Sequence, residues 1–259
     1  MILKERFTFG PRKLRFNADY FSTRRDLGEI TLSARTIAVI GGTGDQGFGL
    51  VLRWAKAGEK IIIGSRVQQK ADDAAKKAME ALGGNGSVVG MENPKAAAAA
   101  DIIVMSVPFA AHVGMIESLK DSIKPDDIFV DVVVPLSTAV GGSATTAVGV
   151  WEGSAAQQAV RLLPPHTKIA SAFHNVVAES LQDITHDVNC DVIVCGDSLE
   201  TRKLVMDLAK KIPGVNPVDG GRLENSRIVE QITALLIGIN IRYKVKDAGI
   251  RITGLPPVK

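Results

Sequence analysis

The 259-residue chain contains few of the residues that build disulfide frameworks or metal centres. It has two cysteines and four histidines, and aromatic residues make up 5% of it. Cys190 and Cys195 lie on one expected strand with their side chains on opposite faces, so they cannot easily bridge. The sequence has no Cys-x-x-Cys motif and no His/Cys cluster, and we therefore expect no metal site and no redox dithiol.

Long apolar runs are missing as well. The N-terminus has no apolar core of the length found in secretory signals. The most apolar later stretch, residues 228–241, contains Glu230, Gln231 and Asn240 and is too short to span a bilayer. These absences predict a soluble, cytoplasmic protein without a membrane partner.

A strong excess of one charge is missing from most of the chain. Lys and Arg number 31 against 28 Asp and Glu, which gives a net charge of +3. Residues 1–35 alone hold eight basic and four acidic residues, so the rest of the chain sums to −1. No nucleic-acid partner is expected, because the excess basic charge is confined to this segment, which we take to be an N-terminal arm or leader.

Strand-like and helix-like segments alternate after residue 35. Strands are expected at 36–40, 60–64, 87–90, 101–107 and 128–134, and helices at 45–57, 67–82, 93–100 and 110–122. Each strand is a nearly continuous apolar run, which is typical of a parallel sheet covered on both faces. The sequence therefore predicts an α/β fold, a Rossmann-type parallel sheet with helices on both faces.

The second half is expected to continue with similar elements. These are a loop at 139–154, helices at 155–163, 199–212 and 225–246, and strands at 168–172 and 191–196. Apolar residues recur at helical spacing in the last helix, at Ile228, Ile232, Leu235, Leu236 and Ile239. Core packing is the default interpretation of this pattern, and a dimer interface is the alternative.

A glycine-rich loop follows the first expected strand. Gly42, Gly44 and Gly47 form a G-x-G-x-x-G motif that opens a helix. The first glycine permits a tight turn, the second a close approach to a pyrophosphate, and the third the packing of helix on sheet. The alternative is a glycine-rich turn without a ligand. The residues expected to bind a dinucleotide here are Gly42, Thr43, Gly44, Asp45, Gln46 and Gly47.

The residues at the end of the second expected strand indicate which dinucleotide binds. An NAD site places a carboxylate there, but this chain has Ser65 and Arg66, followed by Lys70. Cations at the start of a helix oppose its macrodipole, so an anion such as the 2′-phosphate of NADP explains them better than a solvated helix start. After the fourth strand, Val107 and Pro108 are expected to form an apolar wall for the nicotinamide.

Acid–base machinery is not evident. Neither Tyr20 nor Tyr243 begins a Tyr-x-x-x-Lys motif, and Glu224 and Glu230 are too few for a metal-assisted reductoisomerase. A coenzyme site without such groups favours hydride transfer between two cofactors, where the protein mainly orients the rings. Two alternatives stay open: an NADPH-dependent reductase of a flavin or small carbonyl compound, and a non-catalytic NADPH-binding module.

Several motifs occur in a characteristic order between residues 36 and 257. They are GGTGDQGFG, IIGSR, VPF, SAFHN, VCGD and GGRLENSRIVE. In this order the chain resembles the NADPH-dependent coenzyme F420 reductases, also called F420H2:NADP oxidoreductases. The resemblance implies reversible hydride transfer between NADP(H) and the deazaflavin coenzyme F420 (8-hydroxy-5-deazaflavin), and a homodimer.

The resemblance also implies a domain organisation and a second site. Residues 1–35 would be the basic arm, 36–165 the NADP-binding Rossmann domain, and 166–259 a smaller α/β C-terminal domain that completes the deazaflavin cleft. The residues carried over to this cleft are His174, Asn175, Val176, Leu223, Glu224 and Asn225.

Each of the polar residues in the implied cleft has a structural alternative. His174 is a candidate to orient the deazaflavin ring, or else a buried structural histidine. Asn175 and Asn225 could instead cap the helices they precede. The other histidines, His112, His166 and His186, are expected on the surface or in turns.

Overall fold

The structure is a computed structural model, and it describes residues 35–255. The expected basic arm lies outside these residues except for Arg35. All described residues belong to one compact unit.

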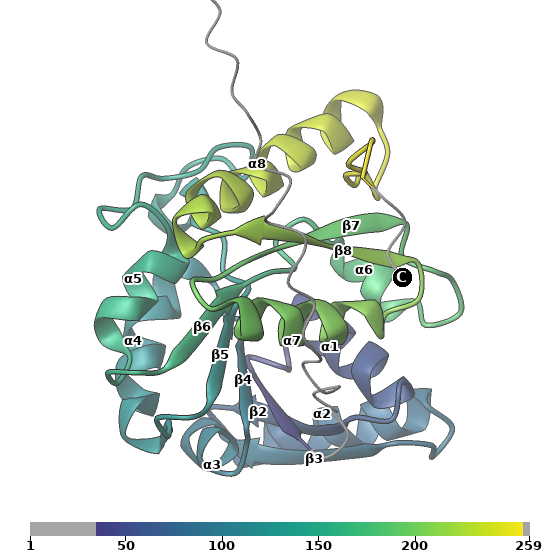
Figure 1. Cartoon of the computed structure of the whole chain (residues 1–259). Helices are drawn as coiled ribbons and strands as arrows, with labels where there is room; N and C mark the ends of the chain where they lie inside the picture. Colours follow the sequence, from purple (N-terminus) through teal and green to yellow (C-terminus); the bar gives the residue numbers. More distant parts are fainter. Residues whose placement is uncertain (1–34, 256–259) are drawn as a thin grey trace, which may run out of the picture. The chain divides into compact units, whose positions relative to one another are not determined.

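Eight strands form a single sheet in the order β3-β2-β1-β4-β5-β6-β7-β8 (Figure 1). Strands β1 to β6 pair in parallel, β7 pairs antiparallel with β6 through Ser171 and Cys195, and β8 is parallel to β7. The strands are β1 (Thr36–Ile40), β2 (Lys60–Ser65), β3 (Ser87–Glu92), β4 (Ile102–Met105), β5 (Ile128–Asp131), β6 (Lys168–Ser171), β7 (Cys190–Cys195) and β8 (Val215–Gly221).

Helices cover both faces of this sheet. The α-helices are α1 (Asp45–Lys56), α2 (Gln68–Ala81), α3 (Asn93–Ala98), α4 (Phe109–Leu119), α5 (Ala155–Leu162), α6 (Ala178–Gln182), α7 (Leu199–Lys210) and α8 (Ser226–Tyr243). Short 3₁₀ turns are η2 (Lys120–Ser122), η3 (Ser137–Val140) and η4 (Leu223–Asn225). Helix α8 runs above β7 and β8 in the view of Figure 1.

Alternate residues of the central strands enter two separate cores. Ile37 and Val39 of β1 join the core under α1, α2 and α7, whereas Ala38 and Ile40 join the core under α3, α4 and α5. All four are fully buried. The prediction of a mostly parallel sheet covered on both faces is therefore confirmed.

A separate C-terminal domain is not confirmed, because the second half continues the same sheet. Strand β6 pairs with β7 through one residue pair, Ser171 and Cys195, and β8 then forms the outer edge of the sheet. Sequence patterns did not predict β8, which contains Pro217 and ends in Gly220 and Gly221. Proline is tolerated on an edge strand because no neighbour there needs its missing N–H. The short α6 was not predicted either.

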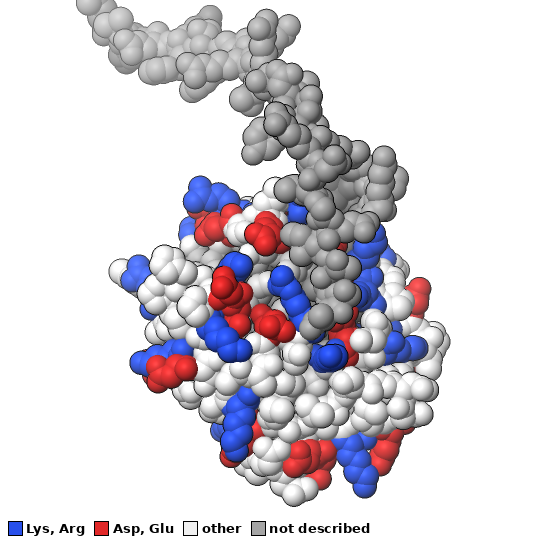
Figure 2. All heavy atoms as spheres, turned by 60° about the horizontal axis from the view of Figure 1, so that its bottom comes forward, with Lys and Arg blue, Asp and Glu red and all other residues white. Residues whose placement is uncertain are grey.

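Basic and acidic side chains are intermixed on the face shown in Figure 2, where neither sign forms an extended area among the described residues. Within residues 35–255 no helix combines the length and the apolar character needed to cross a membrane. The two cysteines are both buried and free, as expected.

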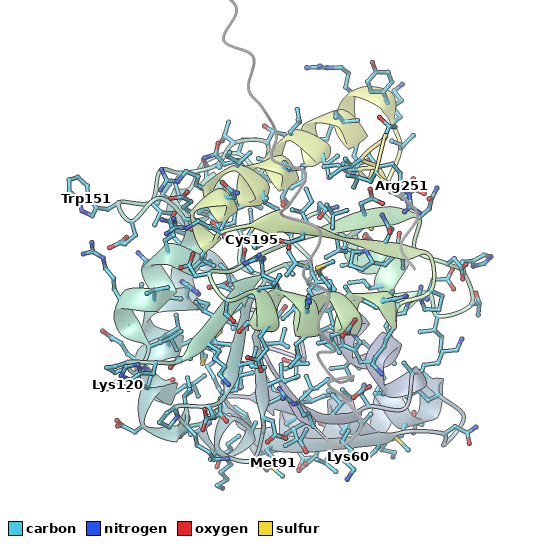
Figure 3. All side chains as sticks on the ribbon, viewed as in Figure 1. Lys60, Met91, Lys120, Trp151, Cys195 and Arg251 are labelled. Carbon is cyan, nitrogen blue, oxygen red and sulfur yellow. The ribbon has the colours of Figure 1, made fainter. Side chains whose placement is uncertain are left out.

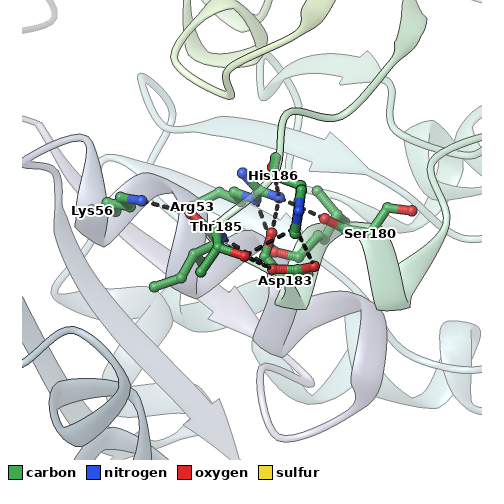
Figure 4. A network of polar contacts seen from close by, with 8 residues as sticks. Arg53, Lys56, Ser180, Asp183, Thr185 and His186 are labelled. Carbon is green, nitrogen blue, oxygen red and sulfur yellow. Dashed lines mark hydrogen bonds and ion pairs between the residues drawn. The ribbon is translucent and has the colours of Figure 1, made fainter.

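Arg53 of α1 anchors the second half of the chain to the first (Figure 4). Its guanidinium is buried and donates hydrogen bonds to the carbonyl oxygens of Ser180, Leu181, Asp183 and His186, at 2.5 to 2.9 Å. These carbonyls belong to the end of α6 and the loop after it, where helix carbonyls lack intrahelical partners. One side chain therefore satisfies two carbonyls of α6 and two of the loop that follows it.

A buried charged cluster joins three elements behind the sheet's carboxyl edge. His112 of α4 and Asp131 of β5 are fully buried, and Nε2 of the histidine lies 2.8 Å from Oδ2 of the aspartate. Burial lowers the pKa of His112, but the charge and hydrogen bond of Asp131, with help from Gln158, raise it above its usual value overall. The expectation that His112 lies on the surface or in a turn was wrong, whereas His166 and His186 are exposed.

Glu230 of α8 completes the cluster. Its carboxylate accepts hydrogen bonds from the N–H groups of Ala155 and Ala156, the first residues of α5, at 2.8 and 3.1 Å. Burial, reinforced by the charge of Asp131, raises the pKa of Glu230 to about 8, although the two N–H groups and His112 act in the opposite direction. Glu230 thus ties α8 to α5 while holding a proton at neutral pH.

The raised pKa of Glu230 predicts a pH dependence of stability. Between its ordinary pKa of 4.5 and about 8, the folded protein holds one proton that the unfolded chain has lost. The free energy of unfolding should therefore fall as pH rises through this window, by up to about 1.4 kcal/mol per pH unit from this group. Denaturant unfolding between pH 5 and 8.5 measures it. Glu230→Gln should show a shallower slope.

The control for this measurement is Glu224→Gln, which removes an exposed carboxylate just before α8. It should reproduce the slope of the wild-type protein. Parallel slopes for wild type and Glu230→Gln would contradict the assignment of the proton to Glu230.

Candidate functional site

The glycine loop connects β1 to α1, and its glycines are required by close contacts. Gly41 has a φ of +79°, and a Cβ there would come within 2.2 Å of the carbonyl oxygen of Ser106. A Cβ on Gly42 would lie 2.8 Å from the Val39 oxygen, and one on Gly47 would lie 2.7 Å from the Gly41 oxygen. The loop can therefore fold only with glycine at these positions.

Gly44 differs from the other glycines because the protein itself leaves room for a side chain. A Cβ there would meet only the Gly41 oxygen, at an ordinary 3.4 Å. Gly44 is also the N-cap residue of α1, and no side chain caps this helix start. The bare backbone and the uncapped N–H groups leave the helix N-terminus open to an anion.

A cavity of about 540 Å³ opens beside this loop. Of the residues predicted for NADP, the structure brings together Thr43, Gly44, Ser65, Arg66, Lys70, Val107 and Pro108 around it. Gly42 and Gly47 are buried within the loop, and Asp45 and Gln46 do not line the cavity. Both residues form hydrogen bonds with the second half of the chain. The Asp45 carbonyl accepts from the side chain of Gln182, and the side chain of Gln46 donates to the Phe173 carbonyl at 3.1 Å.

The charged side chains in the described lining of this cavity are all basic. Ser65 lies at the end of β2, while Arg66 and Lys70 extend from the start of α2. Neither cation has an ion-pair partner in the described part of the chain, and among residues 35–255 no Asp or Glu lines this cavity. The lining therefore offers two uncompensated positive charges and a hydroxyl to an anionic ligand.

The rest of the cavity lining is mostly apolar, and part of it comes from residues that the sequence did not predict. Val107 and Pro108 follow β4 as expected, but Ala111 and Met115 of α4 and Asn93 of α3 also line it. All of them follow the carboxyl ends of parallel strands, where ligands bind in open α/β sheets. The order of the elements could have suggested their location, but not which side chains face inward.

A second cavity of about 400 Å³ lies between the segment after β6 and helix α8. His174, Asn175 and Val176, which the resemblance places at the deazaflavin, line it together with Thr233 and other residues of α8. The hydroxyl of Thr233 donates to the His174 carbonyl at 2.7 Å and fastens the two walls together. The hydrogen bond from Gln46 to the neighbouring Phe173 connects this segment to the glycine loop.

His174 is uncharged at neutral pH. Its side chain is only 4% exposed, and burial lowers its pKa to about 4, although the charge of Asp131 acts in the opposite direction. Neither ring nitrogen has a hydrogen-bond partner among the described residues. Such an unsatisfied buried imidazole has donor and acceptor capacity available for a ligand in the cavity.

The remaining residues carried over from the resemblance do not line the second cavity. Leu223 is buried, Glu224 is exposed, and Asn225 donates to the Gly220 carbonyl at 2.7 Å. Asn225 occupies the N-cap position of α8 without capping it through its side chain. Asn175 does not cap α6 either, since its amide donates to the Asp191 carbonyl at 2.8 Å.

The described residues hold no group of three or more His, Cys, Asp or Glu side chains that could bind a metal ion. The two cavities therefore present phosphate-binding charges, apolar walls and neutral polar groups. This equipment binds and orients organic coenzymes.

Comparisons with known proteins agree with this description. Residues 36–135 match the family model described as coenzyme F420-dependent NADP oxidoreductase. The F420-dependent NADP reductase of Methanothermobacter thermautotrophicus is 47% identical over 88% of this chain and 98% of its own length. The F420-dependent NADP reductase of Methanocaldococcus jannaschii is 48% identical over 85% of this chain and 98% of its own length.

A solved structure supports the fold independently. The crystal structure of a proposed F420-dependent NADP reductase from Arthrobacter sp. FB24 superposes with a TM-score of 0.72, at 21% identity, and covers 85% of this chain and all of its own. At this identity the likeness concerns the fold alone. The close relatives over most of the length decide the family: this chain belongs to the coenzyme F420-dependent NADP oxidoreductases.

Proposed function

We propose that this chain transfers hydride reversibly between NADP(H) and coenzyme F420. The observation that carries the proposal is the cavity beside the glycine loop, which Arg66 and Lys70 line and whose described lining contains no Asp or Glu. Such a lining suits a dinucleotide with an additional phosphate on its ribose. The relatives named F420-dependent NADP reductases support the second coenzyme.

The residues of the first cavity bind and orient NADP(H). The open N-terminus of α1 beside Gly44 receives the pyrophosphate, and Ser65, Arg66 and Lys70 hold the 2′-phosphate. Val107 forms an apolar wall with Pro108 and keeps water from one face of the nicotinamide. The hydride chemistry itself is supplied by the rings of the two coenzymes.

The second cavity is the proposed place of the deazaflavin. All of its lining residues come from 174–248, which supports the role of residues 166–259 in completing the deazaflavin cleft. The neutral His174 orients the ring through its unsatisfied nitrogens, and Val176 contributes apolar surface. Leu223, Glu224 and Asn225 stay predicted contacts, in the turn that leads into α8.

Two features of the protein in the cell stay predictions: the cytoplasmic location and the homodimer. Ile228, Leu235 and Tyr243 lie on one side of α8 and are 64%, 62% and 71% exposed. Trp151, in the loop before α5, is 93% exposed and projects away from the fold (Figure 3). Apolar side chains of this size gathered on one helix face support a partner there, and we propose a second copy of the chain.

The preference for NADP(H) can be tested at Arg66. Arg66→Ala should remove about 1.5–3 kcal/mol of charge-assisted contact with the 2′-phosphate. The affinity for NADPH should fall roughly tenfold or more, while that for NADH changes little. Fluorescence titration of both coenzymes measures the ratio. Arg161→Ala is the matched control, because Arg161 is an exposed arginine of α5 that lines neither this cavity nor the second one. Equal losses for both coenzymes would make Arg66 a structural residue.

Direct transfer to the deazaflavin can be followed with deuterium. NADPH labelled at carbon 4 of the nicotinamide should bleach the absorbance of F420 and deliver the label to the reduced deazaflavin without exchange with water. Mass spectrometry of the product detects it. Faster turnover of a flavin or a small carbonyl compound would support the first alternative. Tight NADPH binding without transfer to any acceptor would instead indicate a binding module.

The homodimer can be tested at the exposed face of α8. Light scattering should give twice the chain mass of 27.5 kDa for the wild type and a single chain for Leu235→Arg, because the arginine would bury a charge in the interface. Leu199→Arg is the matched control, since Leu199 is 51% exposed on another helix. A monomeric wild type, or dissociation by both variants, would contradict the proposal.

A further inference from the structure

A third cavity, of about 640 Å³, adjoins the coenzyme cavity between α3 and α4. Five residues line both cavities: Ser65, Arg66, Asn93, Ala111 and Met115. The glycine loop contributes to the first cavity and not to this one. The third cavity therefore extends from Arg66, just after β2, in the direction away from the glycine loop.

Asn93, the first residue of α3, is a buried amide without adequate partners. It is 4% exposed, and its Oδ1 has no hydrogen-bond partner within residues 35–255. Its Nδ2 contacts only the sulfur of Met115, at 3.3 Å, and a thioether is a weak acceptor. An unsatisfied buried amide group destabilises the folded protein, so a partner from outside the chain is expected.

The backbone below Asn93 also accommodates this amide. Oδ1 faces Gly64 of β2, where a Cβ would come within 2.8 Å of it. The terminal torsion of asparagine is broad, and a rotation about it can turn Oδ1 toward the cavity at the expense of the weak contact with Met115.

We propose that Asn93 recognises the adenine of NADP(H) by accepting a hydrogen bond from its exocyclic amine through Oδ1. This inference rests on the proposed function. Arg66 lines both cavities and holds the 2′-phosphate where they meet, and the base is attached to the same ribose. With the pyrophosphate at the glycine loop, the base must extend the other way, into the third cavity.

The walls of this cavity suit a purine. Ala111 and Met115 of α4 and Pro94 of α3 offer apolar surface to the faces of a flat ring. An asparagine amide is well matched to the amino edge of adenine. Glu92 and Lys95 also line the cavity, but they pair with each other at 2.7 Å. Asn93 is therefore the polar group in the described lining that is buried and still lacks a partner.

This contact would make the site selective for the base. An unsubstituted purine carries only a C–H where adenine carries the amine, so it offers no donor to Oδ1 of Asn93. A site that hydrogen-bonds one group rejects an analogue without it, because its buried polar atom is left unpaired. NADPH should therefore bind tenfold or more tightly than the reduced coenzyme analogue in which unsubstituted purine replaces adenine.

The test measures the dissociation constants of these two coenzymes by fluorescence titration of the full chain without F420. Wild type should prefer NADPH, and Asn93→Leu should bind both with similar affinity. Asn85→Leu, the same change at an exposed site, should keep the preference. A wild type that does not discriminate would overturn the proposal, as would Asn93→Leu weakening both coenzymes equally.

A second variant covers the case in which Asn93→Leu fails to fold. Asn93→Asp keeps an acceptor oxygen, so it should retain the preference for NADPH even if its charge weakens both coenzymes. Loss of the preference in this variant would overturn the proposal. No binding of NADPH to the wild type would refute the proposed function itself, whereas binding without base preference refutes only the role of Asn93.

Discussion

The docking of α1 against the glycine loop is the constraint on which the rest of the structure depends. Gly47 lets the first turn of the helix lie directly on Gly41, and Gly49 lies against Leu181, where a Cβ would come within 2.5 Å of the leucine Cβ. Further along α1, Arg53 binds the carbonyls that end α6, and Nε1 of Trp54 donates to the Leu208 carbonyl at 3.1 Å. One helix therefore shapes the coenzyme loop on one side and positions the second half on the other.

The strands of the first half could be predicted because each one is a local apolar run ended by glycine, proline or a charged residue. Edge strand β8 could not, since Pro217 is acceptable only where no neighbour needs its N–H, and that is known only from the assembled sheet. The burial of His112 was missed for a related reason. Its partner Asp131 is on another element, so local patterns show the histidine without the carboxylate that neutralises it.

The residues of the candidate site likewise fall into those that local sequence patterns predict and those that only the assembled fold brings together. Residues in the loop and at the end of β2 were predictable, because the spacing of Gly44 and Arg66 follows from one strand–turn–helix unit and its neighbour. Asn93 and Met115 were not, since only the packing of α3 beside α4 brings them to one cavity. The residues carried over from the resemblance stay predicted contacts of the deazaflavin: His174 lines the second cavity, whereas Leu223 is buried in the turn before α8.

The position of the buried carboxylates bears on the chemistry of the site. Asp131 and Glu230 line neither the coenzyme cavity nor the cavity beneath α8. Their hydrogen bonds are directed at His112 and at the start of α5, so they hold elements of the fold together. A hydride donor and acceptor that react directly need orientation and exclusion of water more than an acid or base. The hydrogen bonds of the buried cluster fix α4 on β5 and α8 on α5, and so hold in place two helices that line the first and the second cavity.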